Sequence, residues 1–164
     1  MRVQLVRGQL GFTLTEALIT LAVLGVIAAL AVPSLNAFVV NSRVKQAATD
    51  MFMTMAYARN EAISRNTQVS INAVGTWGTG WQVVDAGGNV LKQTTLTAGV
   101  TVTGPAGNAL TFNPNGRLTT AGAVNFTFTV PGNPQIIMRC VTSTLIGQPV
   151  LQADLNRDGN CGNG

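Results

Sequence analysis

A long apolar segment near the N-terminus constrains the fold of this 164-residue chain more than any other feature. Phe12 and Val32 bound a run of 21 residues in which only Glu16 is charged. As an α-helix the run would be about 30 Å long, the thickness of a bilayer's hydrocarbon core. Arg2 and Arg7 precede it, so the positive-inside rule predicts a single pass with the N-terminus in the cytoplasm.

The segment differs from an ordinary secretory signal peptide, whose apolar region has about 7–15 residues and a cleavage site of small residues. This run is longer and carries a carboxylate near its start, which costs about 2.5–3.5 kcal/mol on membrane-insertion scales. A charge tolerated at that cost usually has a partner. Cleavage after Gly11 would create an α-amino group on Phe12 that pairs with Glu16 of an adjacent subunit. The alternative is a plain anchor whose Glu16 reaches the interface.

The sequence GFTLTE, residues 11–16, resembles the processing site of type IV prepilins and of the pseudopilins of type II secretion. The resemblance implies a prepilin peptidase that cuts between Gly11 and Phe12, and N-methylation of Phe12. It makes Glu16 the assembly glutamate, and Pro33 the proline that interrupts or kinks the long helix of many pilins. The implied partners are other pilin or pseudopilin subunits, the peptidase and the bacterial inner membrane.

Helical periodicity continues after the apolar run. Apolar residues recur there at spacings of three and four, and most charged residues fall outside that stripe. We therefore expect a leader over residues 1–11, a transmembrane and assembly helix over 12–33, and an amphipathic helix over 34–66. The apolar stripe comprises Val44, Ala48, Met51, Phe52, Met55 and Ala62.

The remainder, residues 67–164, has the pattern of a β-rich periplasmic head. Short runs rich in β-branched residues alternate with turn signals. The predicted fold class is α+β and pilin-like, with the long N-terminal helix packed against one or two antiparallel sheets. Strands are expected within residues 67–73, 81–85, 89–94, 99–103, 109–112, 124–130 and 135–143, and turns at 78–80, 85–88, 113–116 and 131–134.

Two segments of the head narrow the resemblance. YARNEAISRNTQVSI, residues 57–71, and FNPNGRLT, residues 112–119, resemble the GspH/FimT group of minor pilins and pseudopilins. The resemblance implies a structural subunit of a type II secretion pseudopilus or of a type IV pilus. Some members are linked to DNA uptake, so a DNA-binding minor pilin for natural transformation is the alternative.

The residue inventory argues against an enzyme and suggests no cofactor. The chain contains no histidine, which excludes His-based acid–base catalysis and His metal ligands. Its two cysteines, Cys140 and Cys161, lack a basic partner and both lie near the C-terminus. A disulfide that closes the C-terminal loop outside the cytoplasm is the better explanation for them.

A weak calcium candidate lies in the C-terminal loop. Residues 154–159 match the first half of an EF-hand loop, with Asp154, Asn156 and Asp158 as ligands, but the twelfth-position glutamate is missing. An Asn/Asp/Gly turn tied down by Cys161 explains the same residues without a metal.

The sequence also gives little support for nucleic-acid binding. The net charge of +4 falls to +2 without the two arginines of the leader. DNA-uptake minor pilins carry a Gly-Arg-x-Arg stretch, whereas residues 147–150 here read GQPV. Phosphate contacts need clustered Lys or Arg. The remaining candidates are Arg139 and Arg157, if the disulfide brings them together.

Overall fold

The structure is a computed structural model that describes residues 12–119, 122–133 and 135–162. It divides into two compact units, Met1–Ala37 and Phe38–Gly164, and each is described by itself. One helix, α1 (Leu14–Arg65), belongs to both units. Its residues up to Ala37 form the described helix of the first unit, and its residues from Phe38 onward begin the second. The predicted helices over residues 12–33 and 34–66 are thus two parts of α1, whose bounds include Pro33.

The C-terminus of α1 is closed by an asparagine in the left-handed conformation. Asn66 has a φ of 50°, and its backbone N–H donates to Ile63 O at 3.2 Å. The N–H of Thr67 donates to Ala62 O, also at 3.2 Å. These are the two bonds of a Schellman motif, which satisfies the last carbonyls of a helix and turns the chain away. The chain can therefore enter the first strand two residues later.

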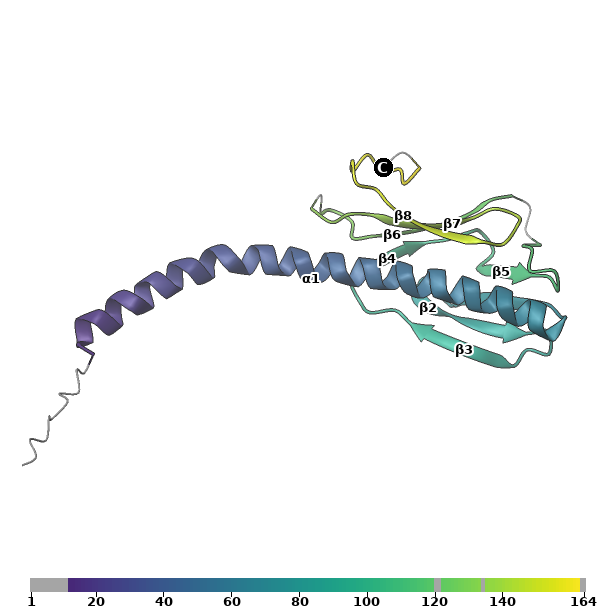
Figure 1. The fold of residues 1–164 in the computed structure, drawn as a ribbon, viewed down its shortest axis with the longest axis horizontal. Coiled ribbons are helices and arrows are strands. Elements are labelled where there is room, and N and C mark those ends of the chain that lie inside the picture. The colour runs from purple at the N-terminus through teal and green to yellow at the C-terminus, as the bar shows by residue number, and fades with distance from the viewer. Residues whose placement is uncertain (1–11, 120–121, 134, 163–164) are drawn as a thin grey trace, which may run out of the picture. The chain divides into compact units, whose positions relative to one another are not determined.

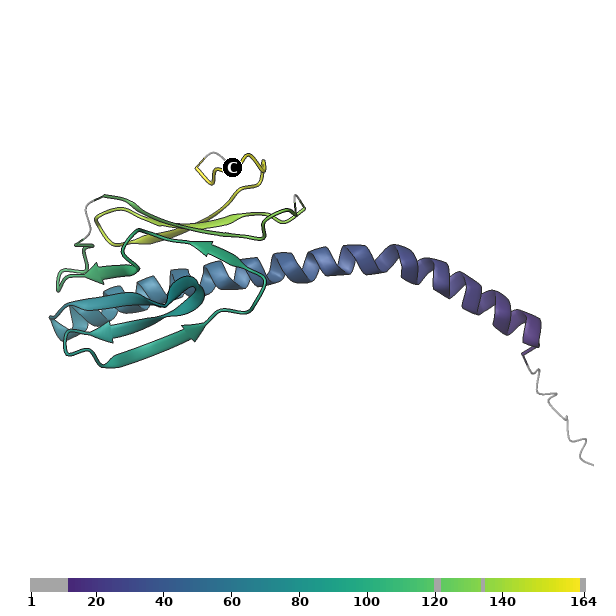
Figure 2. The same cartoon turned by 180° about the vertical axis from the view of Figure 1, so that it is seen from behind.

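The head contains two four-stranded antiparallel sheets (Figures 1 and 2). The first has the order β3-β2-β1-β5, and the second has the order β4-β6-β7-β8. Of the one or two sheets expected, two are present. The strands are β1 (Val69–Val74), β2 (Thr76–Asp85), β3 (Val90–Thr95), β4 (Thr101–Thr103), β5 (Ala109–Phe112), β6 (Val124–Thr129), β7 (Arg139–Ser143) and β8 (Pro149–Ala153).

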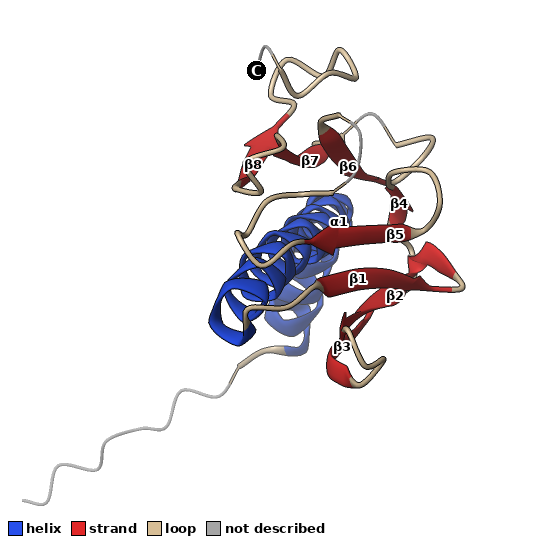
Figure 3. Cartoon of the chain, turned by 90° about the vertical axis from the view of Figure 1, so that its right-hand side faces the viewer, coloured by secondary structure: helices blue, strands red, loops and turns tan. Residues whose placement is uncertain are grey.

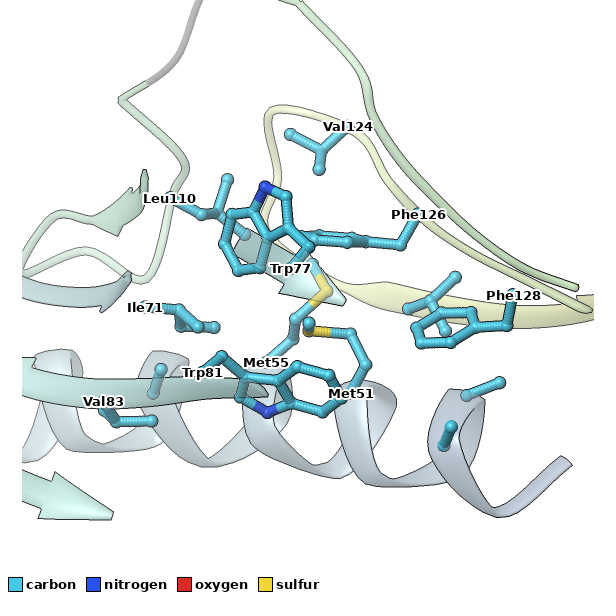
Figure 4. Close-up of a cluster of buried hydrophobic side chains, with 14 of the residues drawn as sticks. Met51, Met55, Ile71, Trp77, Trp81, Val83, Leu110, Val124, Phe126 and Phe128 are labelled. Carbon is cyan, nitrogen blue, oxygen red and sulfur yellow. The ribbon is translucent and has the colours of Figure 1, made fainter. Parts of the chain in front are cut away.

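The core lies where both sheets meet the C-terminal half of α1 (Figure 3). The predicted stripe is buried there, with Phe52 only partly covered, and the structure adds Ala47, Thr54 and Ala58 to the buried side. Two tryptophans of β2 occupy the centre of the cluster (Figure 4). Trp77 meets Phe126 of β6 edge to face, with ring centroids 4.8 Å apart, so this pair joins the two sheets.

The indole N–H groups of both core tryptophans and the Thr54 hydroxyl are hydrogen-bonded. The indole N–H of Trp81 donates to Thr54 Oγ1 at 3.2 Å, and the Thr54 hydroxyl donates to Asp50 O at 2.7 Å. The indole N–H of Trp77 donates to Pro105 O at 3.2 Å. A tryptophan can therefore be buried without leaving its donor unsatisfied.

Two local predictions about the strands were wrong. Residues 78–80 do not form a turn but lie inside β2, and the tight turn is centred on Gly75, whose φ is 78°. Gly80 is instead the point where the neighbouring strand comes close, since a Cβ there would overlap Thr94 O. Strand β8 was not predicted, because Gly147 and Pro149 look like breakers. An edge strand, however, tolerates a proline at its first residue.

The predicted turns at residues 85–88 and 113–116 are confirmed, and each is organised by its first side chain. Asp85 Oδ1 accepts from the backbone N–H groups of Gly87 and Asn89, both at 2.9 Å. The Asn89 side chain donates to both carboxylate oxygens. These bonds lower the pKa of Asp85, with a smaller contribution from the charge of Arg65. Asn113 Oδ1 accepts from two backbone N–H groups in the same way.

Candidate functional site

The first turn of α1 has the geometry of a capped helix start. The backbone N–H of Glu16 donates to Thr13 Oγ1 at 3.3 Å, and that of Ala17 donates to Thr13 O at 3.1 Å. Thr13 is thus the N-cap residue and Glu16 stands in the third helical position, an arrangement in which threonine and glutamate are both favoured. A carboxylate there also interacts favourably with the positive end of the helix dipole.

The side chains around this turn are open to solvent within the chain. Phe12 is 82% exposed and Leu14 77% exposed, and Glu16 is exposed as well. All side chains from residue 12 to residue 29 are exposed. The apolar side chains of residues 12–29 are therefore not covered by the described part of the chain, and Glu16 is accessible to another molecule.

Two predicted residues of this region are only partly covered by the structure. Gly11, on the leader side of the predicted cut, lies outside the described residues. Pro33 falls within the bounds of α1, but its side chain is not among those described. In the part of the chain that the structure describes, no helix has an apolar stretch long enough to cross a bilayer.

The predicted disulfide is present. Cys140, on β7, is bonded to Cys161, with Cα atoms 6.1 Å apart and a sequence separation of 21. Both residues are buried. The bond ties the end of the described chain to the face of the sheet that points away from the core.

Asp154 organises the loop that the disulfide closes. Its side chain is buried, at 3% exposure, and accepts the backbone N–H of Asp158 at 3.2 Å and that of Gly159 at 2.9 Å. The side-chain amide of Asn156 donates to Asp158 Oδ2 at 3.1 Å. The carboxylate of Asp154 therefore serves as an acceptor for the loop's own backbone.

This loop supplies the three residues of the weak calcium candidate. Within the described residues no group of three or more His, Cys, Asp or Glu side chains is arranged to hold a metal ion. The hydrogen bonds within the loop account for Asp154, Asn156 and Asp158 as a structured turn.

The two arginines considered for DNA contact lie on opposite faces of the second sheet. Arg139 pairs with Phe128 across the β6–β7 ladder and so shares the core-facing side, since paired residues point to the same face. Arg157 lines a different groove together with Thr129, which alternates with Phe128 and faces outward. Arg139 and Arg157 therefore line two different grooves.

Gly147, the first residue of the GQPV stretch considered above for DNA contact, has a packing role. Its φ is 81°, and a Cβ there would overlap the carbonyl oxygen of Gly116. The glycine allows the β7–β8 connection to lie against the 113–116 turn. The positive φ and the close approach both require a glycine at this position.

Sequence reasoning missed the residues that attach α1 to the head. Arg59 Nε donates to Gly116 O at 3.1 Å, which joins the two segments quoted for the family resemblance. Asn41 Oδ1 accepts the N–H of Ile137 at 2.8 Å, and its side-chain amide donates to Gln135 O at 3.3 Å. Both are polar residues on a helix, and the sequence signals nothing about contacts 57 or 96 positions away.

Comparisons with known proteins agree with this arrangement. Residues 47–145 match the family described as "Type II transport protein GspH", and residues 6–32 match the "Prokaryotic N-terminal methylation motif". No protein among those with curated descriptions matches the chain.

Two kinds of solved structure resemble the chain. The type IV minor pilin FimU of Pseudomonas aeruginosa aligns with a TM-score of 0.60 and 27% identity, over 68% of this chain and 89% of FimU. The minor pseudopilin EpsH of the Vibrio cholerae type 2 secretion system aligns with a TM-score of 0.55 and 18% identity, over 68% of this chain and 97% of EpsH. The second likeness concerns the fold alone.

The family match covers more than half of the chain, and the methylation motif spans the apolar segment. The long helix packed on antiparallel sheets is the fold of both structural neighbours. The chain is therefore a pilin-like protein that belongs to the GspH family of type II transport proteins.

Proposed function

We propose that the chain is a minor subunit of a type II secretion pseudopilus or a type IV pilus, made as a precursor and assembled through its N-terminal helix. A prepilin peptidase cuts between Gly11 and Phe12, and the new amine of Phe12 is methylated. Other pilin or pseudopilin subunits are the partners. The role is structural, in keeping with a family of filament subunits and not of enzymes.

The observation that carries this proposal is the capped first turn. Cleavage after Gly11 leaves a cationic amine one residue before the N-cap, Thr13. The N-terminus of a helix already carries a partial positive charge, so an ammonium group there is unfavourable without a carboxylate nearby. The Glu16 side chain is exposed, so its carboxylate is open to a neighbouring subunit, and in the filament it pairs with the Phe12 amine of that neighbour. Because the pair forms only at one axial offset, it sets the register between subunits.

Membrane insertion precedes assembly in this proposal. Supporting it are the run from Phe12 to Val32 with its single charge, the two arginines before it, and the methylation motif over residues 6–32. The head then lies in the periplasm, where the disulfide between Cys140 and Cys161 forms under oxidising conditions.

The proposal is tested with Glu16→Gln, which removes the charge and keeps the shape. The variant should insert, be cut before Phe12 and fold normally, yet be lost from sheared or pulled-down filaments. Thr20→Leu is the control, because it changes another exposed position of the same helix without a carboxylate. Mass spectrometry of the N-terminus and immunoblots of filaments give the readouts. Normal incorporation of Glu16→Gln would refute the pairing.

DNA binding remains the second candidate, without an observation that favours it over the first. A mobility shift of duplex DNA by the full chain in neutral detergent, at low and high salt, tests it directly. Salt-sensitive binding that Arg157→Ala or Arg139→Ala abolishes would establish it.

A further inference from the structure

Strand β8 is the last strand of the second sheet, and no further strand lies on its outer side among the described residues (Figure 3). Its register with β7 sets Arg139 opposite Ala153, so Met138 stands opposite Asp154. The N–H of Asp154 donates to Met138 O at 3.0 Å. Because bonded and non-bonded pairs alternate along an antiparallel ladder, only every second residue of β8 bonds to β7 through its backbone. The backbone groups of the other residues point to the open side, and these residues are Pro149, Leu151 and Ala153.

The open side of β8 offers two N–H donors, those of Leu151 and Ala153, and the carbonyl oxygens of the same two residues and of Pro149. Pro149 lacks an N–H, but at its position that group would face solvent, so the ladder with β7 loses no bond. No residue of β8 is charged and none is buried. An uncharged strand with unpaired backbone groups is a template for a further strand.

The other three edge strands of the head are each obstructed. β3 carries Lys92, and its ladder with β2 has an irregularity between Val83 and Val84. β4 has only three residues. The outer side of β5 is in use, because the N–H of Thr119 donates to Thr111 O at 3.0 Å. Lysines, bulges and short length commonly protect an exposed edge, whereas β8 has only the proline at its first residue.

A groove adjoins β8 on the face of the sheet that points away from the core. Its volume of about 380 Å³ falls in the range of about 300–1,000 Å³ usual for ligand pockets. Val150 of β8 and its ladder partner Thr142 line it, together with the exposed Ile146. None of its lining residues is charged. A strand added beside β8 has side chains next to Val150 on this face, so an apolar side chain there can reach the groove.

We propose that β8 binds an extended, uncharged segment of another polypeptide as a further strand of its sheet, with apolar side chains at alternate positions of that segment. In this mode of recognition, main-chain hydrogen bonds supply affinity and pockets for alternate side chains supply specificity. The absence of charge at the edge and in the groove selects the occupant, because a charged side chain there would lose water without gaining a partner. The inference concerns the head alone and does not depend on the proposed function.

A second copy of β8 fits this edge less well than a different segment does. Antiparallel pairing centred on Leu151 would place the amide of the partner subunit's Gln152 beside Val150 and the uncharged groove. It would also set the Ala153 carbonyl against Pro149, which has no N–H to donate. A segment with an apolar residue and an ordinary N–H at these two positions avoids both faults.

Amide hydrogen exchange followed by NMR, on the full chain in neutral detergent, tests the edge and its occupant together. In the free chain the amides of Leu151 and Ala153 should exchange about tenfold faster than those of Val150 and Gln152, which bond to β7. The probe is a peptide of alternating valine and threonine, blocked at both ends and used at about 1 mM, the weak end of specific binding. It should slow exchange at Leu151 and Ala153 and leave the other two amides unchanged.

Val150→Lys should weaken binding of the probe by about fivefold, because it places a charge at the edge and in the groove. Val90→Lys is the matched control, since Val90 lies on the edge strand β3 and is 51% exposed, against 49% for Val150. The same peptide with methyl groups on the amide nitrogens that face β8 cannot donate to its carbonyl oxygens and should not bind. Circular dichroism of each variant verifies that the head is folded.

Four outcomes would overturn the proposal. The first three are unchanged exchange at Leu151 and Ala153 with the probe present, an equal loss of affinity in Val90→Lys, and equal binding of the methylated peptide. The fourth is protection of the same two amides without any probe that rises with the concentration of the chain, because a second copy would then be the occupant. The exchange measurement uses the unaltered chain, so it decides the question even if a variant fails to fold.

Discussion

Arg59 of α1 donates a hydrogen bond of 3.1 Å to the carbonyl oxygen of Gly116, in the turn that follows β5. Gly116 has a φ of 71°, and a Cβ there would come within 2.6 Å of Ile63 Cδ1. The backbone of Gly116 therefore packs directly against Ile63 of α1, and no space is left between them for a side chain at position 116. This contact joins the segment of residues 57–71 to that of residues 112–119 in the fold.

Gly116→Ala should destabilise the head by about 1–3 kcal/mol, because it combines a strained backbone with overlap at Ile63. Gly88→Ala is the control for strain alone, since Gly88 has a φ of 84° and open space where its Cβ would lie. Urea unfolding of both variants in neutral detergent measures the difference. Equal losses for the two substitutions would show that the packing on α1 contributes nothing.

Asp154→Ala should cost about 1–3 kcal/mol, because it leaves backbone N–H groups of the C-terminal loop without their buried acceptor. Limited proteolysis should then cut residues 155–160 faster, even with the disulfide intact. Asn160→Ala is the matched control, because its side chain is exposed and accepts a single hydrogen bond, from Gly162. Unchanged protease sensitivity in Asp154→Ala would mean that the disulfide alone holds the loop.

The turn at Asp85 should make the head sensitive to acid. The folded pKa of Asp85 lies below its ordinary value of 3.8, chiefly because Asn89 donates to the carboxylate. The stabilisation of the folded head by the ionised Asp85 carboxylate is therefore complete above pH 3.8. It is lost as the pH falls through the lower pKa that Asp85 has in the folded state. In melting curves taken between neutral and acidic pH, Asn89→Ala should shrink this dependence. A variant that melts with the same pH profile as the parent would contradict the assignment.

Processing should depend on the size of the residue before the cut. Gly11→Ala should still be cut in part, whereas Gly11→Leu should leave the full-length precursor, because the predicted peptidase site accepts only a small residue there. Intact-mass measurement of the membrane-extracted chain distinguishes the two. A native product that retains Met1, or one cut far beyond Pro33, would remove the basis for the precursor altogether.

The sequence by itself determined the elements that depend on neighbours in the chain. The period of 3.6 residues over positions 44–62 and the alternation in β1, β2 and β6 require only local patterns, and these predicted the helix, most strands and the buried stripe. The processing motif is likewise a contiguous signal. Two cysteines near one end in a chain without histidine were enough to predict the disulfide.

Only the tertiary structure decided the contacts between distant segments. The sequence pattern around Gly80 predicts a turn, yet the residue lies within β2. A glycine is needed there because the backbone of β3, at Thr94, occupies the space that a side chain would fill. Strand β8 forms because it pairs with β7, and a pattern of neighbouring residues does not encode this pairing. Lys45 of α1 and Arg139 of β7 line one groove although they are far apart in the chain. Such pairings arise from the packing of whole elements, which a local sequence pattern does not encode.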